Sequence, residues 1–468
     1  EMSMTSSPQP PTTTGPVTLA SVGARLDRLP TGPFHRRVML LAGLTFVFEV
    51  GDQGAVGMAA SALREHLGVG LQGVAFAVSA MYLGLLAGAV AAGQLGDRLG
   101  RRTPLIWGMA GMALFSALAA LSPNITVLVL LRLLTGVFLG AAYVGVVVYL
   151  SEVFPHRRRA LALAVAVSVG TLATVGLTHL AGVVVPMGEH GWRIIFALGL
   201  LGLLVVPACW RLPESPRWLV AKGRTEEAEQ ALRGIEESTA ARRGPLPEPV
   251  VPELVHEAGA GPARARELPF AALFRGRLAA TTLMLMICWI CYSATMQVTT
   301  TWTPTILGAR GFDAASALST AANLTLGSLV GSLVAIVVAD RFPRRAMLIG
   351  IGLIGALAAL AFGLATDHLL LLLAGGAVFF FAGITSPVLN TYMAEEFPTE
   401  VRARGSGIAF SAGRLTNVAA PFTIALLLGA LGHQAIAWAS FGAWLLLGGS
   451  VLLLGRRRRG ATGMREDV

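Results

Sequence analysis

Charged side chains are scarce in this chain. Asp, Glu, Lys and Arg make up only 13% of its 468 residues, whereas soluble domains carry about 25%. Hydrophobic residues make up 54%, and the mean hydropathy is +0.68. This balance excludes an ordinary soluble domain and indicates that most of the chain lies in lipid.

Lysine and cysteine are also rare, which argues against several chemistries. The single lysine, Lys222, does not stand in a phosphate-binding loop, and the sequence has no G-x-S-x-G motif. The cysteines Cys209, Cys288 and Cys291 lie inside apolar stretches, without a second C-x-x-C pair or a histidine cluster. We therefore expect no enzymatic activity, no metal site and no cofactor other than the proton as a coupling ion.

About twelve apolar stretches are present, each long enough to cross a ~30 Å hydrocarbon core as a helix. Helices satisfy their own backbone hydrogen bonds, as lipid demands. The sequence therefore predicts an all-α membrane protein with twelve transmembrane helices in two pseudo-symmetric six-helix bundles. The stretches lie near residues 38–60, 73–95, 104–121, 124–149, 160–185, 192–212, 278–302, 314–339, 346–365, 368–393, 403–430 and 434–455.

Two charged motifs occur twice, 243 residues apart. Asp97, in G-D-R-L-G-R-R, returns as Asp340 in A-D-R-F-P-R-R, and Glu152, in Y-L-S-E-V-F-P, returns as Glu395 in Y-M-A-E-E-F-P. The two acids of each copy are 55 residues apart. This register predicts a duplicated membrane unit, and transporters built from such repeats hold their substrate between the halves.

The net charge of +10 comes from arginine clusters that all fall on one side of the membrane if the spans alternate, while the opposite loops are short and nearly neutral. By the positive-inside rule, both termini and the long central loop are cytoplasmic, in an inner (plasma) membrane protein. The arginines then face solvent or lipid headgroups, and we expect no nucleic-acid partner and a monomer.

The polar segments divide the chain. We expect residues 1–34 to form a disordered cytoplasmic tail, because they are rich in Pro, Thr and Ser, and 458–468 to form a second tail. Residues 35–212 and 278–457 are the two bundles. Residues 213–277 are a cytoplasmic loop with an amphipathic piece at Glu226 to Glu237.

These features resemble the major facilitator superfamily over residues 35–457: twelve spans, a long central loop and the doubled G-x-x-x-D-R-x-G-R-R pattern. P-E-S-P-R-W-L at 213–219 resembles a signature of its sugar-porter, organic-ion and metabolite:proton symporter branches. Gly413-Arg414 followed by Pro421 resembles the eleventh helix of the organic-ion, synaptic-vesicle-protein-like and aromatic-acid:proton symporter branches. Two family patterns are missing: the double glutamine of sugar porters in helix 7 and the G-P-x-x-G-G pattern of drug:proton antiporters in helix 5. Their absence disfavours sugar transport and drug export.

Four charges stand inside predicted spans away from their ends, where each costs at least about 2.5–3.5 kcal/mol and so suggests a function. They are Glu49 and Asp52 in the first span, Arg132 in the fourth and Arg414 in the eleventh. Aromatic-acid:proton symporters and nicotinate transporters carry D-x-x-D where this chain has E-V-G-D. We expect Asp52, together with Glu49 and coupled to Arg132, to carry the proton. The alternative for Asp52 and Arg132 is a structural ion pair.

The remaining candidates line the expected substrate path and its gate. Arg414 is expected to hold an anionic substrate where Pro421 breaks its helix, and Pro304 is expected to break the seventh span. Further substrate contacts are expected from Tyr143, Tyr292, Gln297 and Asn390. A cytoplasmic charge network, closed in the outward-facing state and broken in the inward-facing state, is expected from Asp97, Arg98, Arg101, Glu152, Arg159, Asp340, Arg341, Glu395 and Arg402.

The function that fits best is proton-coupled symport of a small organic anion, such as a benzoate- or nicotinate-like carboxylate, by alternating access. An organic-cation carrier or multidrug:proton exporter is the first alternative, with the acids of the first span as the binding groups. A sensor that uses a transporter scaffold without transport is the second alternative. The sequence does not identify the substrate, its stoichiometry with protons or the direction of transport.

Overall fold

The computed structural model describes residues 17–249, 270–338, 341–398 and 401–455, and within these ranges the regular structure is helical throughout. The twelve predicted stretches all coincide with helices or with runs of shorter helical segments; the stretch 192–212 comprises α7, a 3-10 helix over Leu198–Leu204 and α8. The elements are α1 (Leu19–Asp27), α2 (Pro33–His66), α3 (Leu71–Leu99), α4 (Arg102–Ala119), α5 (Ile125–Val153), α6 (Arg159–Val184), α7 (Gly191–Ala197), α8 (Val206–Trp210), α9 (Pro216–Ala221), α10 (Thr225–Arg243), α11 (Gly276–Gln297), α12 (Thr303–Ala309), α13 (Ala314–Val338), α14 (Arg344–Leu364), α15 (His368–Glu396), α16 (Arg402–Leu431) and α17 (His433–Leu454).

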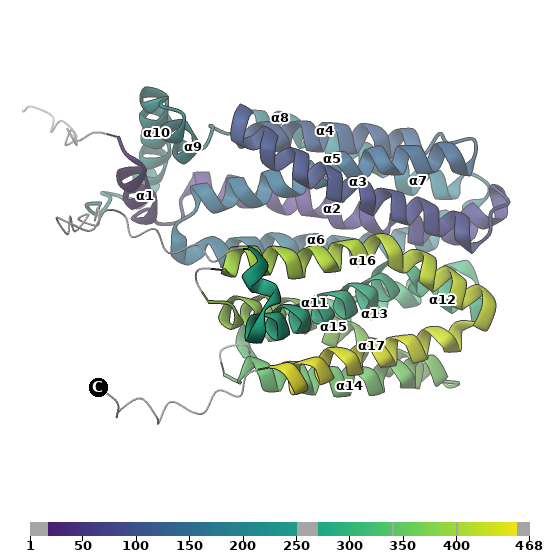
Figure 1. Ribbon diagram of the computed structural model, residues 1–468. Coiled ribbons are helices and arrows are strands. Elements are labelled where there is room, and N and C mark those ends of the chain that lie inside the picture. The colour runs from purple at the N-terminus through teal and green to yellow at the C-terminus, as the bar shows by residue number, and fades with distance from the viewer. Residues whose placement is uncertain (1–16, 250–269, 339–340, 399–400, 456–468) are drawn as a thin grey trace, which may run out of the picture.

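The long helices form two bundles, α2–α8 and α11–α17, which lie one above the other in Figure 1. Eleven candidate spans in the described residues meet both the length and the hydropathy expected for crossing a membrane. The twelfth, α4, has 18 residues and begins with Arg102-Thr103-Pro104, which lowers its hydropathy. Large apolar side chains such as Leu40, Trp107 and Leu453 are exposed on the outside of the bundles, as expected of surfaces that face lipid.

The duplication seen in the charged motifs extends to the packing of the helices. Gly84 on α3 lies against α5 so closely that a Cβ there would be 2.1 Å from the Leu133 carbonyl oxygen. Its counterpart 243 residues later, Gly327 on α13, lies in the same way against α15, 2.5 Å from the Gly376 oxygen. Small residues allow such close helix packing in membranes. Gly84 and Gly327 are therefore packing residues.

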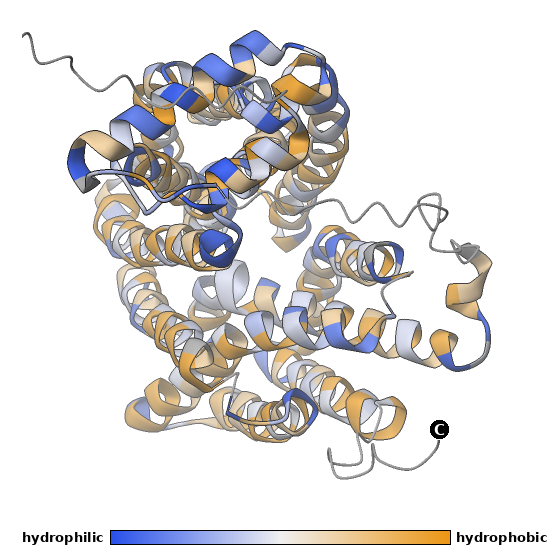
Figure 2. Ribbon diagram, turned by 90° about the vertical axis from the view of Figure 1, so that its left-hand side faces the viewer, coloured by the Kyte–Doolittle hydropathy of each residue, from blue (hydrophilic) through white to orange (hydrophobic). Residues whose placement is uncertain are grey.

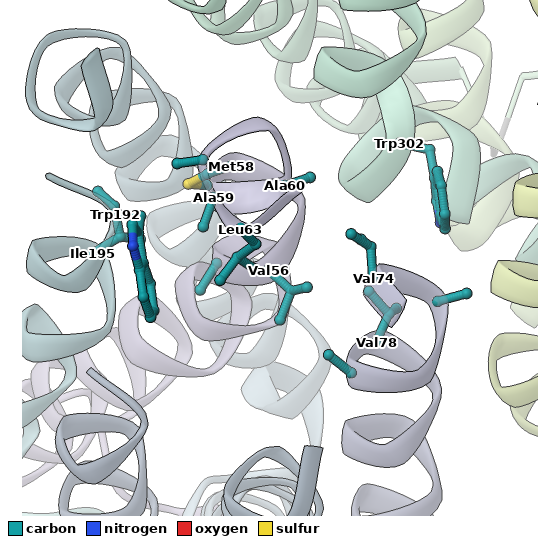
Figure 3. Close-up of a cluster of buried hydrophobic side chains, with 14 of the residues drawn as sticks. Val56, Met58, Ala59, Ala60, Leu63, Val74, Val78, Trp192, Ile195 and Trp302 are labelled. Atoms are coloured by element: carbon teal, nitrogen blue, oxygen red, sulfur yellow. The ribbon is translucent and has the colours of Figure 1, made fainter. Parts of the chain in front are cut away.

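One apolar cluster joins the two bundles at a single end of the molecule. Figure 3 shows Val74 and Val78 of α3 beside Trp302, which belongs to the C-terminal bundle. The cluster also holds Ala420, Ile424 and Leu428 of α16. All these residues lie in the helix halves far from the arginine clusters, so the bundles are closed against each other at this end, which we call the opposite face.

The arginine-rich face, formed by the helix ends that carry Arg36, Arg101, Arg157 and Arg344, is different. Figure 2 views the molecule from this end. The other two large apolar clusters of the described residues each stay within one half, one spanning residues 22–235 and the other residues 273–451. The bundles therefore pack together at the opposite face, whereas at the arginine-rich face each has a core of its own.

Residues 17–34 correct the expectation of a disordered tail over 1–34; residues 1–16 lie outside the described residues. Helix α1 packs against α9 and bonds to α10 at the arginine-rich face (Figure 1). Arg25 binds Glu229 at 2.6 Å and Glu236 at 2.7 Å, and Arg28 binds Glu236 at 2.6 Å. We call these four residues the α1–α10 clasp. Helix α10 contains the amphipathic piece expected at Glu226–Glu237.

The clasp depends on carboxylate charge. Burial raises the pKa of Glu236, but the hydrogen bonds and charges of Arg25 and Arg28 outweigh burial and hold this pKa below its ordinary value. A carboxyl whose pKa is lower in the folded state contributes stability that is present at neutral pH and is lost as the pH falls through the lowered pKa.

We therefore expect Arg25→Gln to loosen α1. Each lost charge-assisted hydrogen bond is worth roughly 1.5–3 kcal/mol, so amide hydrogen exchange in residues 19–27 should become roughly ten- to a hundredfold faster. Arg36→Gln, at an exposed position nearby, is the control and should leave this exchange unchanged. Acidification below about pH 4 should have the same effect on the parent protein. Equal protection of α1 in Arg25→Gln and parent would show that the clasp does not hold this helix.

Candidate functional site

Helix α2 places two acids one turn apart, and they have different surroundings. Asp52 points into the N-terminal bundle and meets Arg132 of α5. The guanidinium donates to both carboxylate oxygens, at 2.7 and 3.1 Å, and the Ser116 hydroxyl of α4 donates to the carboxylate at 2.6 Å. Arg132 is fully buried, bonds the Asp52 carbonyl and lies over the Phe196 ring of α7. The pair thus ties four helices of one bundle together.

Glu49 lies where the two bundles meet. It is 5% exposed, and its carboxylate accepts a hydrogen bond from the Gln53 amide of the same helix. Gln53 in turn accepts a bond from the Tyr82 hydroxyl of α3 at 3.3 Å. In the described residues Glu49 makes no direct ion pair, but its charge interacts with that of Arg414 on α16 in the other bundle.

Arg414 stands among aromatic rings from both bundles. Its guanidinium carbon is 5.2 Å from the centre of the Tyr143 ring on α5 and 5.0 Å from that of Phe410 on its own helix. The Tyr143 ring meets Phe46 of α2 edge to face, and Phe410 meets Trp289 of α11 in the same way. The half-buried Arg414 makes no direct ion pair with any described residue. We call Glu49, Gln53, Tyr82, Tyr143, Phe410 and Arg414 the central cluster.

Helix α16 runs without a break through Pro421, contrary to the expectation. Proline has no N–H, so the Asn417 carbonyl, four residues earlier, loses its helical partner. The Gln297 amide of α11 donates to this carbonyl at 3.1 Å. Gln297 therefore satisfies the backbone at the proline. The seventh span changes to a π-helical segment, Val298–Trp302, between α11 and α12, and Pro304 stands in the first turn of α12; the span nevertheless stays helical from Gly276 to Ala309, so the expected break is seen only as this local change of helix type.

The two other predicted substrate contacts lie outside the central cluster. Asn390 is exposed on α15 and donates to the Ser386 carbonyl of its own helix. Tyr292 is half-buried on α11 and packs edge to face on Trp289. The structure brings Arg414, Tyr143 and Glu49 together, and it places Asp52 with Arg132 as a separate buried pair.

At the arginine-rich face, the charged motifs form equivalent pairs inside each half. Arg101 binds Glu152 at 2.8 Å and the exposed Asp97 at 2.6 Å; 243 residues later, Arg344 approaches Glu395 at 3.4 Å. Each of these pairs joins parts of a single half. A latch between the halves remains a prediction for a state that closes this face.

The other predicted gate residues are not members of these ion pairs. Arg159 and Arg402 are again equivalent, and each donates to a backbone carbonyl five residues earlier, at 3.0 and 3.4 Å. Arg98 and Arg341 are exposed. Asp340 lies outside the described residues.

Sequence reasoning missed three residues that lie at the gate and at the buried pair. Glu214 of the P-E-S-P-R-W-L motif accepts from the backbone N–H of Arg101 and from that of Arg102, and so caps α4. The role of Ser116 could not be predicted from the sequence, because it is an isolated serine in an apolar span. Arg344 could have been found, because it repeats Arg101 at the 243-residue offset.

Comparison with known proteins identifies the family of this chain and a solved structure with the same fold. The family described as sugar (and other) transporter matches residues 38–454. The niacin transporter NiaP of Acinetobacter baylyi is 28% identical over 402 residues, covering 86% of this chain and 89% of that protein. The 4-hydroxybenzoate transporter PcaK of Pseudomonas aeruginosa is 29% identical over 416 residues, covering 87% and 89%. A crystal structure of a D-xylose-proton symporter matches with a TM-score of 0.72 at 18% identity, over 90% of this chain and 98% of that one, which confirms the fold.

The buried pair yields a stability prediction. Asp52→Asn leaves the Arg132 charge uncompensated, and breaking a buried ion pair in this way costs about 3–5 kcal/mol. We expect Asp52→Asn and Arg132→Leu each to lower the midpoint of thermal unfolding in detergent markedly. The double variant should lose much less than the sum of the two, because it leaves no buried charge behind. Strictly additive losses would show that the two side chains do not stabilise each other.

Proposed function

Because the chain belongs to the family of sugar and other transporters, within the major facilitator superfamily, we propose that it carries small aromatic or heterocyclic carboxylates across the membrane together with protons. Family membership confirms the resemblance drawn from the motifs. The chain is a multi-pass membrane transporter and not an enzyme.

The observation that carries the proposed substrate is the position of Arg414. It is a cation between the two bundles, it makes no direct ion pair with a described residue, and aromatic rings of both bundles surround it. A guanidinium is a planar fork that matches a carboxylate with two parallel hydrogen bonds. Rings beside it offer stacking and edge contacts to a planar ligand. An aromatic carboxylate satisfies both features at once.

The relatives support the same class of substrate. Their names assign niacin, gallate and 4-hydroxybenzoate to proteins that match most of this chain. All three compounds are small rings that carry a carboxylate. The alternative of an organic-cation carrier requires an available acid in the bilayer. Asp52 is already bound by Arg132 and Ser116, and the charge of Glu49 interacts with that of Arg414, so both acids of α2 already have a cation near them, which favours an anion over a cation as substrate.

Proton coupling and orientation complete the proposal. The D-xylose-proton symporter shares the fold, and two acids of α2 lie within the membrane as candidates for the proton. We place the arginine-rich face in the cytoplasm of an inner-membrane protein, following the positive-inside rule. The structure, closed at the opposite face, then corresponds to an inward-facing state of alternating access.

Arg414→Lys tests the substrate. Lysine keeps the charge but not the fork, and one charge-assisted hydrogen bond is worth roughly 1.5–3 kcal/mol. We therefore expect the affinity for benzoate, nicotinate or 4-hydroxybenzoate to fall roughly ten- to a hundredfold, measured by calorimetry on the purified protein. Arg37→Lys, at an exposed position on α2, is the control and should bind as the parent does. Binding of quaternary amines that Arg414→Lys leaves intact would instead establish the organic-cation carrier.

Reconstituted protein tests the coupling. Uptake of the bound carboxylate into proteoliposomes should increase with an inward proton gradient and fall when an uncoupler is added. The same uptake with and without the gradient would leave facilitated diffusion as the mechanism.

A further inference from the structure

The two acids of α2 are not equivalent candidates for the coupled proton. Asp52 receives two guanidinium hydrogen bonds and one hydroxyl hydrogen bond, so its negative charge is compensated within its own bundle. Among the described residues, the Glu49 side chain accepts a hydrogen bond from the neutral Gln53 amide and from no other group. The cation whose charge acts on Glu49 is Arg414 of the other bundle, which lies over the Tyr143 ring, and that ring in turn contacts Phe46, one turn before Glu49 on α2.

The positive charge of Arg414 would therefore interact with two different carboxylates. In the absence of substrate it is the cation that offsets ionised Glu49. A substrate carboxylate bound to Arg414 would bring a second negative charge to the same arginine. Two carboxylates cannot both stay ionised at low cost when they share one cation in a buried setting, and one of them then takes a proton.

We propose that the substrate carboxylate and ionised Glu49 compete for Arg414, so that the anion binds together with one proton on Glu49. The inference rests on the proposed function and adds the residue and the stoichiometry. The proton moves from water to the Glu49 carboxylate as the substrate binds, and it returns to water on the other side when the substrate leaves. No covalent bond forms or breaks apart from this O–H bond.

The neighbours of Glu49 favour Glu49 over the other groups as the proton site. The charged groups that act on it are Arg414 of α16 and Asp52 of its own helix, and Asp52 adds a repulsion that a proton on Glu49 removes. Tyr82 of α3 and Tyr143 of α5 are the titratable groups of the neighbouring helices, and both remain neutral near pH 7 because phenols lose their proton near pH 10. Arg132 is committed to Asp52.

The neutral form of Glu49 also fits its surroundings. A protonated carboxyl keeps an oxygen that accepts the Gln53 hydrogen bond, and it no longer needs Arg414. Linkage makes the coupling reciprocal: substrate binding promotes protonation of Glu49 by the same factor as protonation promotes substrate binding.

The test is the pH dependence of binding. Substrate carboxyls are ionised above about pH 6, so any change in Kd between pH 6 and 9 reports on the protein. With benzoate as the probe, or whichever of nicotinate and 4-hydroxybenzoate the parent binds best, log Kd of the parent should rise with pH toward a slope of about 1, as one linked proton requires. Glu49→Gln mimics the protonated state and should bind with a nearly constant Kd. Glu65→Gln, at an exposed position on α2, is the matched control and should follow the parent.

A second measurement does not depend on the variant's folding. When the probe is added to the parent in weakly buffered solution near pH 8, a pH indicator should record uptake of close to one proton per bound substrate. Glu49→Asp, which keeps a carboxyl, should also take up a proton. Binding by the parent without proton uptake, or a folded Glu49→Gln that keeps the parent's pH slope, overturns the inference and leaves the proposed substrate class standing. If the parent binds none of the carboxylates, the proposed function is wrong and the inference falls with it.

Discussion

The cost of placing a charge in the hydrocarbon region governs the centre of this protein. At least about 2.5–3.5 kcal/mol for each charge has to be offset by a partner. For Asp52 the offset lies within the N-terminal bundle: Arg132 donates two hydrogen bonds to its carboxylate, and the Ser116 hydroxyl donates a third. This pair fixes the rotation of α2 against α5. Since Glu49 stands three residues earlier, on an adjacent part of the helix surface, the rotation that buries Asp52 also presents Glu49 to the other bundle.

The second pair of charges is divided between the bundles. Glu49 and Arg414 interact without direct contact, and aromatic rings of α5 and α16 lie beside the arginine. A complete ion pair here would hold the bundles in one arrangement. A divided pair leaves a cation for a ligand, and the energy of ligand binding then depends on how the two halves are placed. Under the proposed function, this geometry would connect substrate binding to alternating access.

Both halves repeat one structural unit in detail. Gly84 and Gly327 allow equivalent close approaches of neighbouring helices, and Arg101–Glu152 corresponds to Arg344–Glu395. The halves are therefore similar units, each with its own core at the arginine-rich face, and the cluster around Trp302 joins them at the opposite face. The α1–α10 clasp adds a polar contact to the N-terminal half. The described residues of the C-terminal half contain no counterpart of this clasp.

The sequence by itself determined the twelve spans, the duplication and the presence of charges in the membrane, because hydropathy, helix length and the 243-residue repeat are properties of the chain's order. It also paired Asp52 with Arg132, the two opposite charges of one half. Only the tertiary structure decided which acid faces which bundle, because Glu49 and Asp52 differ by less than one helical turn and their partners come from α4, α5 and α16. Two further contacts could not be predicted from the sequence: the hydrogen bond from Gln297 to the Asn417 carbonyl, which has no helical partner because of Pro421, and the bonds by which Arg25 holds α1 on α10. Both contacts join residues far apart in sequence, and only the folded chain brings such residues together.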